Sequence, residues 1–230
     1  MPSLSPSSRG RLRAASLRCN ALIGIILSLP ACTQGGGTTP MADTVSMMWG
    51  DSPADMADYA RQVPYASLAL SMDGNDALVV MAYQSGGTGE RTLWQARDQA
   101  TLELRHGVPF ASAGFDNELL GIDYSTPSSA DNLLDAHALT VQWRDADGQQ
   151  HVDSAQIQTQ CEPAALLQLP LVTRSLEACH QRVDWLHAGT SDNTLWRDPV
   201  TRRIWAGDIE PWPDAQRIAW QVARPWWPQN

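Results

Sequence analysis

Short apolar segments separated by turn residues recur along most of the chain, and they constrain the fold more than any other feature. Apolar and polar residues alternate in many of these segments, as in 139–145, which reads LTVQWRD. Alternation with a period of two is typical of strands that bury one face of a sheet. Asp/Gly/Asn turns such as DGND at 73–76 and ADG at 146–148 separate neighbouring segments. Such turns join antiparallel strands, so the pattern predicts an antiparallel sheet.

The expected strands are spread over the chain from residue 65 to residue 227. They are 65–72, 77–84, 92–97, 100–106, 106–115, 139–145, 150–158, 193–198, 202–212 and 217–227, with two more expected within 161–187. A sheet of this size must curl over its own core or close on itself. We therefore expect a mainly β fold: an antiparallel curved sheet, half-barrel or sandwich-like, with a short helical N-terminal segment.

The helical segment is expected between residues 41 and 61, where apolar residues fall at helical spacing. Pro53 interrupts this spacing, which predicts either two short helices or one helix after a turn. Ser52 is placed to act as the N-cap, and Pro53 suits the first helical position.

The first 31 residues have the anatomy of a bacterial export signal. Four arginines precede an apolar stretch at 21–29 that is too short to cross a membrane as a helix. The segment LPAC at 29–32 resembles a lipobox, the site at which a lipoprotein is cut before a cysteine that carries lipid. We expect residues 1–31 to be a lipoprotein signal peptide and Cys32 to be the lipid attachment site, bearing acyl chains such as palmitate. An ordinary signal peptide with a chance cysteine is the alternative.

The residues after the lipobox predict the organisation of the mature protein. TQGGGTTP at 33–40 is small, polar and glycine-rich, so residues 32–40 are expected to form the lipidated cysteine and a flexible tether. Residues 41–230 are expected to form a single β-rich domain. Thr33 follows the cysteine where retention in the inner membrane would favour aspartate, which favours the outer membrane.

The chain is acidic, with 25 acidic and 16 basic residues and a net charge of −9. Cleavage after residue 31 would remove four arginines and no acidic residue, which makes the mature charge −13. This charge argues against nucleic acid as a partner and against docking on anionic lipid through basic patches. All basic residues are arginine, which excludes a Schiff-base lysine and the lysine of a phosphate-binding loop.

Cys161 and Cys179 are the two cysteines left in the predicted domain. In an oxidising compartment an even pair favours a disulfide, which would stabilise the domain by about 3 kcal/mol on the chain-entropy model. Two free buried thiols are the alternative. The sequence has no CxxC spacing of a zinc site, so no metal is expected.

The sequence carries no catalytic signature. DADG at 145–148 lacks the later acidic ligands of a calcium loop and is expected to form a hairpin turn. No GxSxG elbow supports a serine nucleophile, and a carboxylate pair such as Asp208 and Glu210 cannot be assigned without geometry. His180 and His187 are expected to be structural or surface residues. We therefore expect no catalytic residue, no cofactor and no enzymatic activity.

Tryptophan is used heavily, with 10 residues against two phenylalanines. Most of the tryptophans lie in alternating segments and are expected in the core. Trp226 and Trp227, which lie between two prolines, are harder to explain in this way. Exposed tryptophan is a platform for sugar rings, so this pair is a candidate contact for a partner or a glycan. Packing of the pair against the sheet edge is the favoured alternative.

A series of motifs in a fixed order points to one family. They are a Pro-Tyr pair before the first strand (Pro64, Tyr65), a Trp followed by an acidic residue and a strand (Trp94, Asp98, Leu102), a His-Gly turn (His106, Gly107), a cysteine ahead of the closing strands (Cys179) and a Trp-x-Asp…Thr hairpin (Trp196, Asp198, Thr201). Together with the lipobox and tether, they resemble the YjbF/GfcB family of lipoproteins, which are encoded with exopolysaccharide or group 4 capsule genes. The likeness spans roughly residues 45–228.

The resemblance implies a mostly antiparallel β domain on the periplasmic face of the outer membrane. It also implies two kinds of protein partner from the same gene cluster, an outer-membrane β-barrel and periplasmic proteins, with the polysaccharide as a further candidate partner. The expected function is that of a non-enzymatic accessory factor in export or assembly of capsule or exopolysaccharide. It implies no catalytic residues.

Two alternatives stay open at this point. A periplasmic carrier of lipid or hydrophobic cargo would have an internal apolar cavity. A glycan-modifying enzyme would have carboxylates clustered in a cleft.

Overall fold

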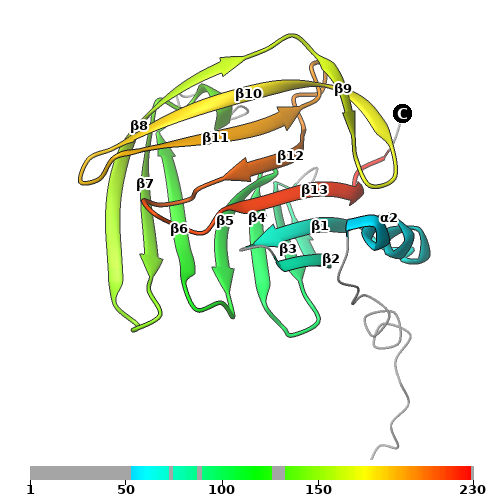
Figure 1. Cartoon of the computed structure of the whole chain (residues 1–230), viewed down its shortest axis with the longest axis horizontal. Coiled ribbons are helices and arrows are strands. Elements are labelled where there is room, and N and C mark those ends of the chain that lie inside the picture. The colour runs from blue at the N-terminus through cyan, green and yellow to red at the C-terminus, as the bar shows by residue number, and fades with distance from the viewer. Residues whose placement is uncertain (1–52, 73–74, 87–89, 126–132, 229–230) are drawn as a thin grey trace, which may run out of the picture. The chain divides into compact units, whose positions relative to one another are not determined.

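A computed structural model describes residues 53–72, 75–86, 90–125 and 133–228, where one α-helix is followed by thirteen strands (Figure 1). The helix is α2 (Pro53–Gln62). The strands are β1 (Ser67–Met72), β2 (Asn75–Ser85), β3 (Arg91–Gln95), β4 (Thr101–Arg105), β5 (Val108–Ala113), β6 (Glu118–Ser125), β7 (Ala138–Arg144), β8 (Gln150–Cys161), β9 (Ala165–Gln168), β10 (Thr173–Trp185), β11 (Thr190–Arg197), β12 (Ile204–Ile209) and β13 (Ile218–Arg224). The predicted signal peptide, Cys32, the tether and Ser52 lie outside the described residues.

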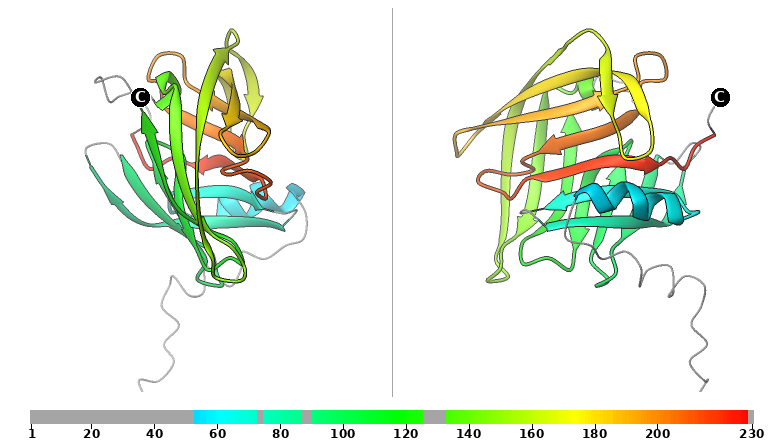
Figure 2. Two further views of the ribbon diagram at one scale, coloured as in Figure 1. Left: turned by 90° about the vertical axis from the view of Figure 1, so that its left-hand side faces the viewer. Right: turned by 45° about the vertical axis from the view of Figure 1, so that its right-hand side comes forward.

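The strands form one antiparallel sheet in the order β5-β4-β3-β2-β1-β13-β12-β11-β10-β8-β7-β6, and β9 pairs with β10 beside this path. The first and last strands, β1 and β13, are neighbours in the middle of the sheet. Figures 1 and 2 show β10 to β13 running across β3 to β7, so that the sheet curls over a core. This confirms the predicted fold class, a curved antiparallel sheet with a short helix at its N-terminal end.

The ends of the sheet, β5 and β6, lie against each other without a backbone ladder between them in the described residues. Side chains bridge this seam instead. The backbone N–H of Leu119 donates to Oγ of Ser112 at 2.9 Å. The ring of Phe110 lies next to Gly121, where a Cβ would be 3.6 Å from it. The curled sheet therefore has one seam that its backbone does not seal.

The helix α2 begins at Pro53, the position that the sequence predicted for its first turn. A proline is tolerated there because its missing N–H would have no partner within the helix. Met56, Ala60 and Val63 recur at helical spacing and pack together against residues of β2 and β13. The guanidinium of Arg224, at the end of β13, donates to the carbonyl oxygen of Val63 at 2.9 Å. The helix is thus fixed on one face of the sheet.

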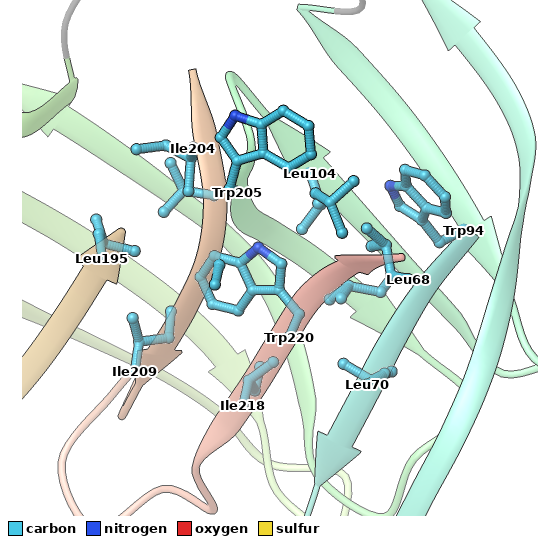
Figure 3. Close-up of a cluster of buried hydrophobic side chains, with 14 of the residues drawn as sticks. Leu68, Leu70, Trp94, Leu104, Leu195, Ile204, Trp205, Ile209, Ile218 and Trp220 are labelled. Carbon is cyan, nitrogen blue, oxygen red and sulfur yellow. The ribbon is translucent and has the colours of Figure 1, made fainter. Parts of the chain in front are cut away.

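The opposite face of β1 and β13 points into the core (Figure 3). Leu68 and Trp94 have no exposed surface and Trp220 is 1% exposed. Their side chains converge with those of Leu70, Ile218 and others in one cluster. Large aromatic side chains thus fill the interior of the curved sheet at this point.

Candidate functional site: a groove on the outer face of the sheet

The terminal tryptophans pack against other aromatic rings. Trp226 meets Trp94 edge to face with 5.1 Å between ring centroids, and Trp227 meets Trp205 in the same way at 5.1 Å. Trp227 is only 8% exposed and belongs to the core cluster. It therefore has little free surface on which a sugar ring could stack.

Cys161 and Cys179 are direct partners across β8 and β10, and the structure joins them in a disulfide. An oxygen of Glu177 and both sulfurs lie within 4.8 Å of one another, a spacing that would suit a metal ion. The sulfurs are bonded to each other, however, so neither is available as a thiolate ligand. Nε of Arg197 donates instead to Oε2 of Glu177 at 2.6 Å.

The double variant Cys161→Ala/Cys179→Ala is expected to lower the free energy of unfolding by about 3 kcal/mol, because the 18-residue separation closes a loop that restricts the unfolded chain. Urea unfolding under oxidising conditions measures this loss. The reduced wild-type domain, with its thiols blocked, should show a loss of similar size. Equal stability of the oxidised wild type and the variant would contradict the prediction.

Two aspartates, the buried Asp153 of β8 and the half-buried Asp198 after β11, accept several hydrogen bonds each. Burial raises the pKa of Asp153, but hydrogen bonds from His187 (2.8 Å) and from the backbone N–H of Ser154 (2.7 Å) outweigh it and lower the pKa overall. Burial also opposes ionisation of Asp198, whose pKa is lowered overall by backbone hydrogen bonds from Thr201 and Val200. Both side chains therefore ionise more readily in the folded chain than in the unfolded one.

A carboxyl group with a lowered pKa stabilises the folded state above its unfolded pKa, which is about 3.9 for aspartate, and this stabilisation is lost as the pH falls. The free energy of unfolding is therefore expected to fall steadily from pH 6 to pH 3. Asp153→Asn should remove about 1–2 kcal/mol at pH 6 and flatten this acid limb. Urea unfolding midpoints across that range provide the measurement, and an unchanged slope in the variant would contradict the assignment to Asp153.

A groove of about 590 Å³ lies between α2 and the turn that joins β9 to β10. Figure 2 (right) shows α2 and this turn on the same side of β13. Alternation along β1 and β13 places Ala69, Ser71, Ala219 and Gln221 on the face opposite Leu68 and Trp220. We call this the outer face, and the small side chains on it form the floor of the groove.

The borders of the groove carry one aromatic ring and several polar groups. Trp196 of β11 lines one side, and Gln168 and Leu169 come from the end of β9 and the turn after it. Arg61 of α2 lines the other side and is paired with Asp58. The site thus combines an aromatic surface with hydrogen-bonding side chains.

Asp76 and Asp208 are two carboxylates that line the groove. Their positions bear on the alternative of a glycan-modifying enzyme, which would have carboxylates clustered in a cleft. They lie on β2 and β12 and are connected through the cross-strand partners Ser71 and Ala219. Three strand spacings separate their backbones by about 14 Å. Oδ1 of Asp208 also accepts a hydrogen bond from Nε of Arg217 at 2.7 Å. Asp208 is therefore held in an ion pair rather than free to act with Asp76.

The carboxylate pair considered from the sequence, Asp208 with Glu210, is likewise committed to local structure. Oε1 of Glu210 accepts the backbone N–H of Asp214 at 2.9 Å. The histidines singled out earlier also have structural contacts, because His180 lies 3.1 Å from the hydroxyl of Thr194 and His187 binds Asp153.

The described part of the chain contains no helix that is both long and apolar enough to cross a membrane. A family model described as group 4 capsule polysaccharide lipoprotein gfcB, YjbF, matches residues 42–208. The chain belongs to the YjbF family. The match runs through α2 and most of β12, so it includes the order of motifs on which the sequence resemblance was based.

A solved structure shares the YjbF-family fold. The hypothetical lipoprotein YmcC from Escherichia coli (K12) superposes with a TM-score of 0.63 at 15% identity, covering 74% of this chain and 88% of its own. At that identity the likeness shows the fold alone. Among curated proteins, none matches this chain in sequence.

Sequence reasoning did not identify the groove. Trp196 was recognised as part of a family motif and as an aromatic strand residue, and its alternation gave no reason to distinguish it from a core residue. Ala219 and Gln221 lie beside Trp220 in an alternating strand, so the pattern shows which face they share but not what flanks that face. The groove depends on where α2 and the β9–β10 turn pack, which no local pattern records.

Proposed function

We propose that this YjbF-family protein is an outer-membrane lipoprotein, anchored through Cys32, whose domain faces the periplasm. It acts there as a non-enzymatic accessory factor in the export or assembly of capsule or exopolysaccharide. The family match over residues 42–208 carries the proposal, because it covers most of the chain and its description joins a lipoprotein to a capsule polysaccharide.

The geometry of the groove supports a role without catalysis. Its two carboxylates lie on strands three spacings apart, and Asp208 is held in an ion pair with Arg217. The filled core argues against the cargo-carrier alternative, which would need an internal cavity, because Leu68, Trp94 and Trp220 occupy the space inside the curved sheet.

Our proposal assigns this protein partners from the same gene cluster, namely an outer-membrane β-barrel and periplasmic export proteins. The acidic charge, −13 after removal of residues 1–31, supports protein partners over direct binding of an anionic polymer, because like charges repel. Side chains at the surface rather than a catalytic centre would then carry the function.

Purification of complexes from detergent-solubilised envelopes, with the intact lipidated protein as bait, tests the proposal. Recovery of an outer-membrane β-barrel and polysaccharide-export components is the expected result, with an unrelated outer-membrane lipoprotein of similar size as the control bait. Deletion of the gene should also lower the surface polysaccharide of the cell. Recovery of no export component, together with unchanged surface polysaccharide in the deletion strain, would overturn the proposal.

A further inference from the structure

We propose that the groove between α2 and the β9–β10 turn binds a chain of surface polysaccharide directly, through uncharged sugar units. The choice of polysaccharide as the ligand class rests on the proposed function. The choice of this groove, rather than the terminal tryptophan pair, rests on the geometry described above.

The groove has the size of a ligand site. Its volume of about 590 Å³ falls within the roughly 300–1,000 Å³ typical of sites for small molecules. Ala69, Ser71 and Ala219 on its floor are short, and residues of α2 and of the β9–β10 turn line it beside them. A short stretch of sugar rings fits a trough of this kind.

The lining matches the two-sided chemistry of a sugar ring. A pyranose has an apolar face of C–H groups and a rim of hydroxyls. Trp196 provides an aromatic surface, and the amide of Gln221 can donate and accept hydrogen bonds. The amide of Gln168 donates to the carbonyl oxygen of Leu169 and accepts from the hydroxyl of Thr173, which leaves it one further N–H and one further lone pair. Ser71 adds a hydroxyl on the floor. Each kind of group on the sugar therefore has a counterpart in the groove.

The strands beneath the groove cannot take up an added peptide strand. β1 pairs with β2 and β13, β13 pairs with β1 and β12, and β12 pairs with β13 and β11. Their ladder hydrogen bonds are thus used on both edges, and strand addition needs an open edge. A ligand must be held by side chains, as a glycan is.

Charge favours uncharged sugars over anionic ones. The two arginines at or beside the groove are neutralised, Arg61 by Asp58 and Arg217 by Asp208, and Asp76 adds a further carboxylate. The groove therefore offers no excess positive charge for an anionic sugar, and the acidic chain around it would repel one.

Binding can be tested by affinity gel electrophoresis of the purified soluble domain in polysaccharide extracted from the surface of cells that express the protein. Ala219→Phe fills the floor of the groove and should weaken binding at least tenfold. Gln221→Ala removes hydrogen bonds without adding bulk and should weaken binding several-fold. Thr190→Phe is the matched control, because it places the same ring at an exposed strand position outside the groove and should bind as the wild type does.

Thermal unfolding of each variant shows whether it is folded, and Gln221→Ala keeps the test valid if Ala219→Phe does not fold. No retardation of the wild type, or equal retardation of all folded variants, would overturn the inference. Complementation of a deletion strain distinguishes failure of the groove proposal from failure of the proposed function. If deletion of the gene lowers surface polysaccharide and the folded Ala219→Phe protein restores it fully, the accessory function stands and the groove proposal falls.

Discussion

The Cys32→Ser variant is expected to incorporate no labelled palmitate, whereas the wild-type protein incorporates it readily. The sulfur of Cys32 is the atom that would receive the diacylglyceryl group, and cutting before this residue would free the amine that is then acylated. A serine hydroxyl does not replace the sulfur in this reaction. The variant should therefore accumulate as a precursor that is longer by residues 1–31, which intact-mass spectrometry detects.

The chemistry of the anchor sets the size of the expected effect. Each buried CH₂ of an acyl chain contributes about 0.8 kcal/mol to membrane binding, so a single chain holds weakly and several chains hold firmly. Loss of all the chains should lower palmitate labelling to background. The Cys19→Ser variant is the matched control, because Cys19 lies in the same predicted leader and would be removed with it. Undiminished labelling of Cys32→Ser, or loss of labelling in Cys19→Ser, would contradict the assignment.

The strands of the domain could largely be predicted from the sequence, because the signals that define them are local. His106 and Gly107 have φ values of 49° and 85°, and this left-handed pair forms the turn between β4 and β5 that the sequence indicated. Two strands were expected within 161–187, and β9 and β10 lie there. The helix α2 likewise begins at the expected proline.

The strand β6 was not predicted, for a physical reason. Its pairing with β7 shifts between Leu119 and Gly121, so the side chains on the two sides of this irregularity do not follow one alternating pattern. Glycine also has a weak preference for strands. The apolar residues of ELLGIDYS therefore did not show the period of two that marked the other strands.

The pairing of β1 with β13 shows where local signals end. The two strands are separated by nearly the whole domain, and no turn residue joins them. Their pairing depends on how the whole sheet curls over its core. The entropy cost of bringing together two segments so far apart grows only slowly with loop length, and no short segment of the sequence records which segments will pair. The groove floor is built on this pair, so the site could not be placed before the topology was known.

The tryptophans illustrate the same limit at the level of single residues. Trp227 and Trp196 are the same residue type, and the sequence offered Trp227 as a candidate contact, with packing against the sheet edge as the favoured alternative. Trp227 is buried by Trp205, whereas Trp196 lines the groove. Only the packing of distant segments separates the two environments.

The second large effect is expected at Gly207. Gly207 of β12 is the direct cross-strand partner of Trp220 of β13, and the indole lies over the glycine so closely that an added Cβ would overlap three ring atoms. Trp220 is 1% exposed within the core cluster, so its ring has no free space into which it could move. Gly207→Ala should therefore lower the free energy of unfolding by about 1–3 kcal/mol, and Gly207→Val by more.

Urea unfolding of four variants, Gly207→Ala, Gly189→Ala, Trp220→Leu and Gly207→Ala/Trp220→Leu, distinguishes this overlap from a general effect of replacing glycine. Gly189→Ala is the matched control, because no atom lies within 4 Å of the added Cβ there, and it should change stability by less than about 0.5 kcal/mol. Gly207→Ala combined with Trp220→Leu should cost less than the sum of the two single changes, because the smaller side chain makes room for the new methyl group. If the losses in the double variant were additive, the loss of stability in Gly207→Ala would not come from overlap with Trp220. The close packing of β12 on β13 would then not depend on this pair.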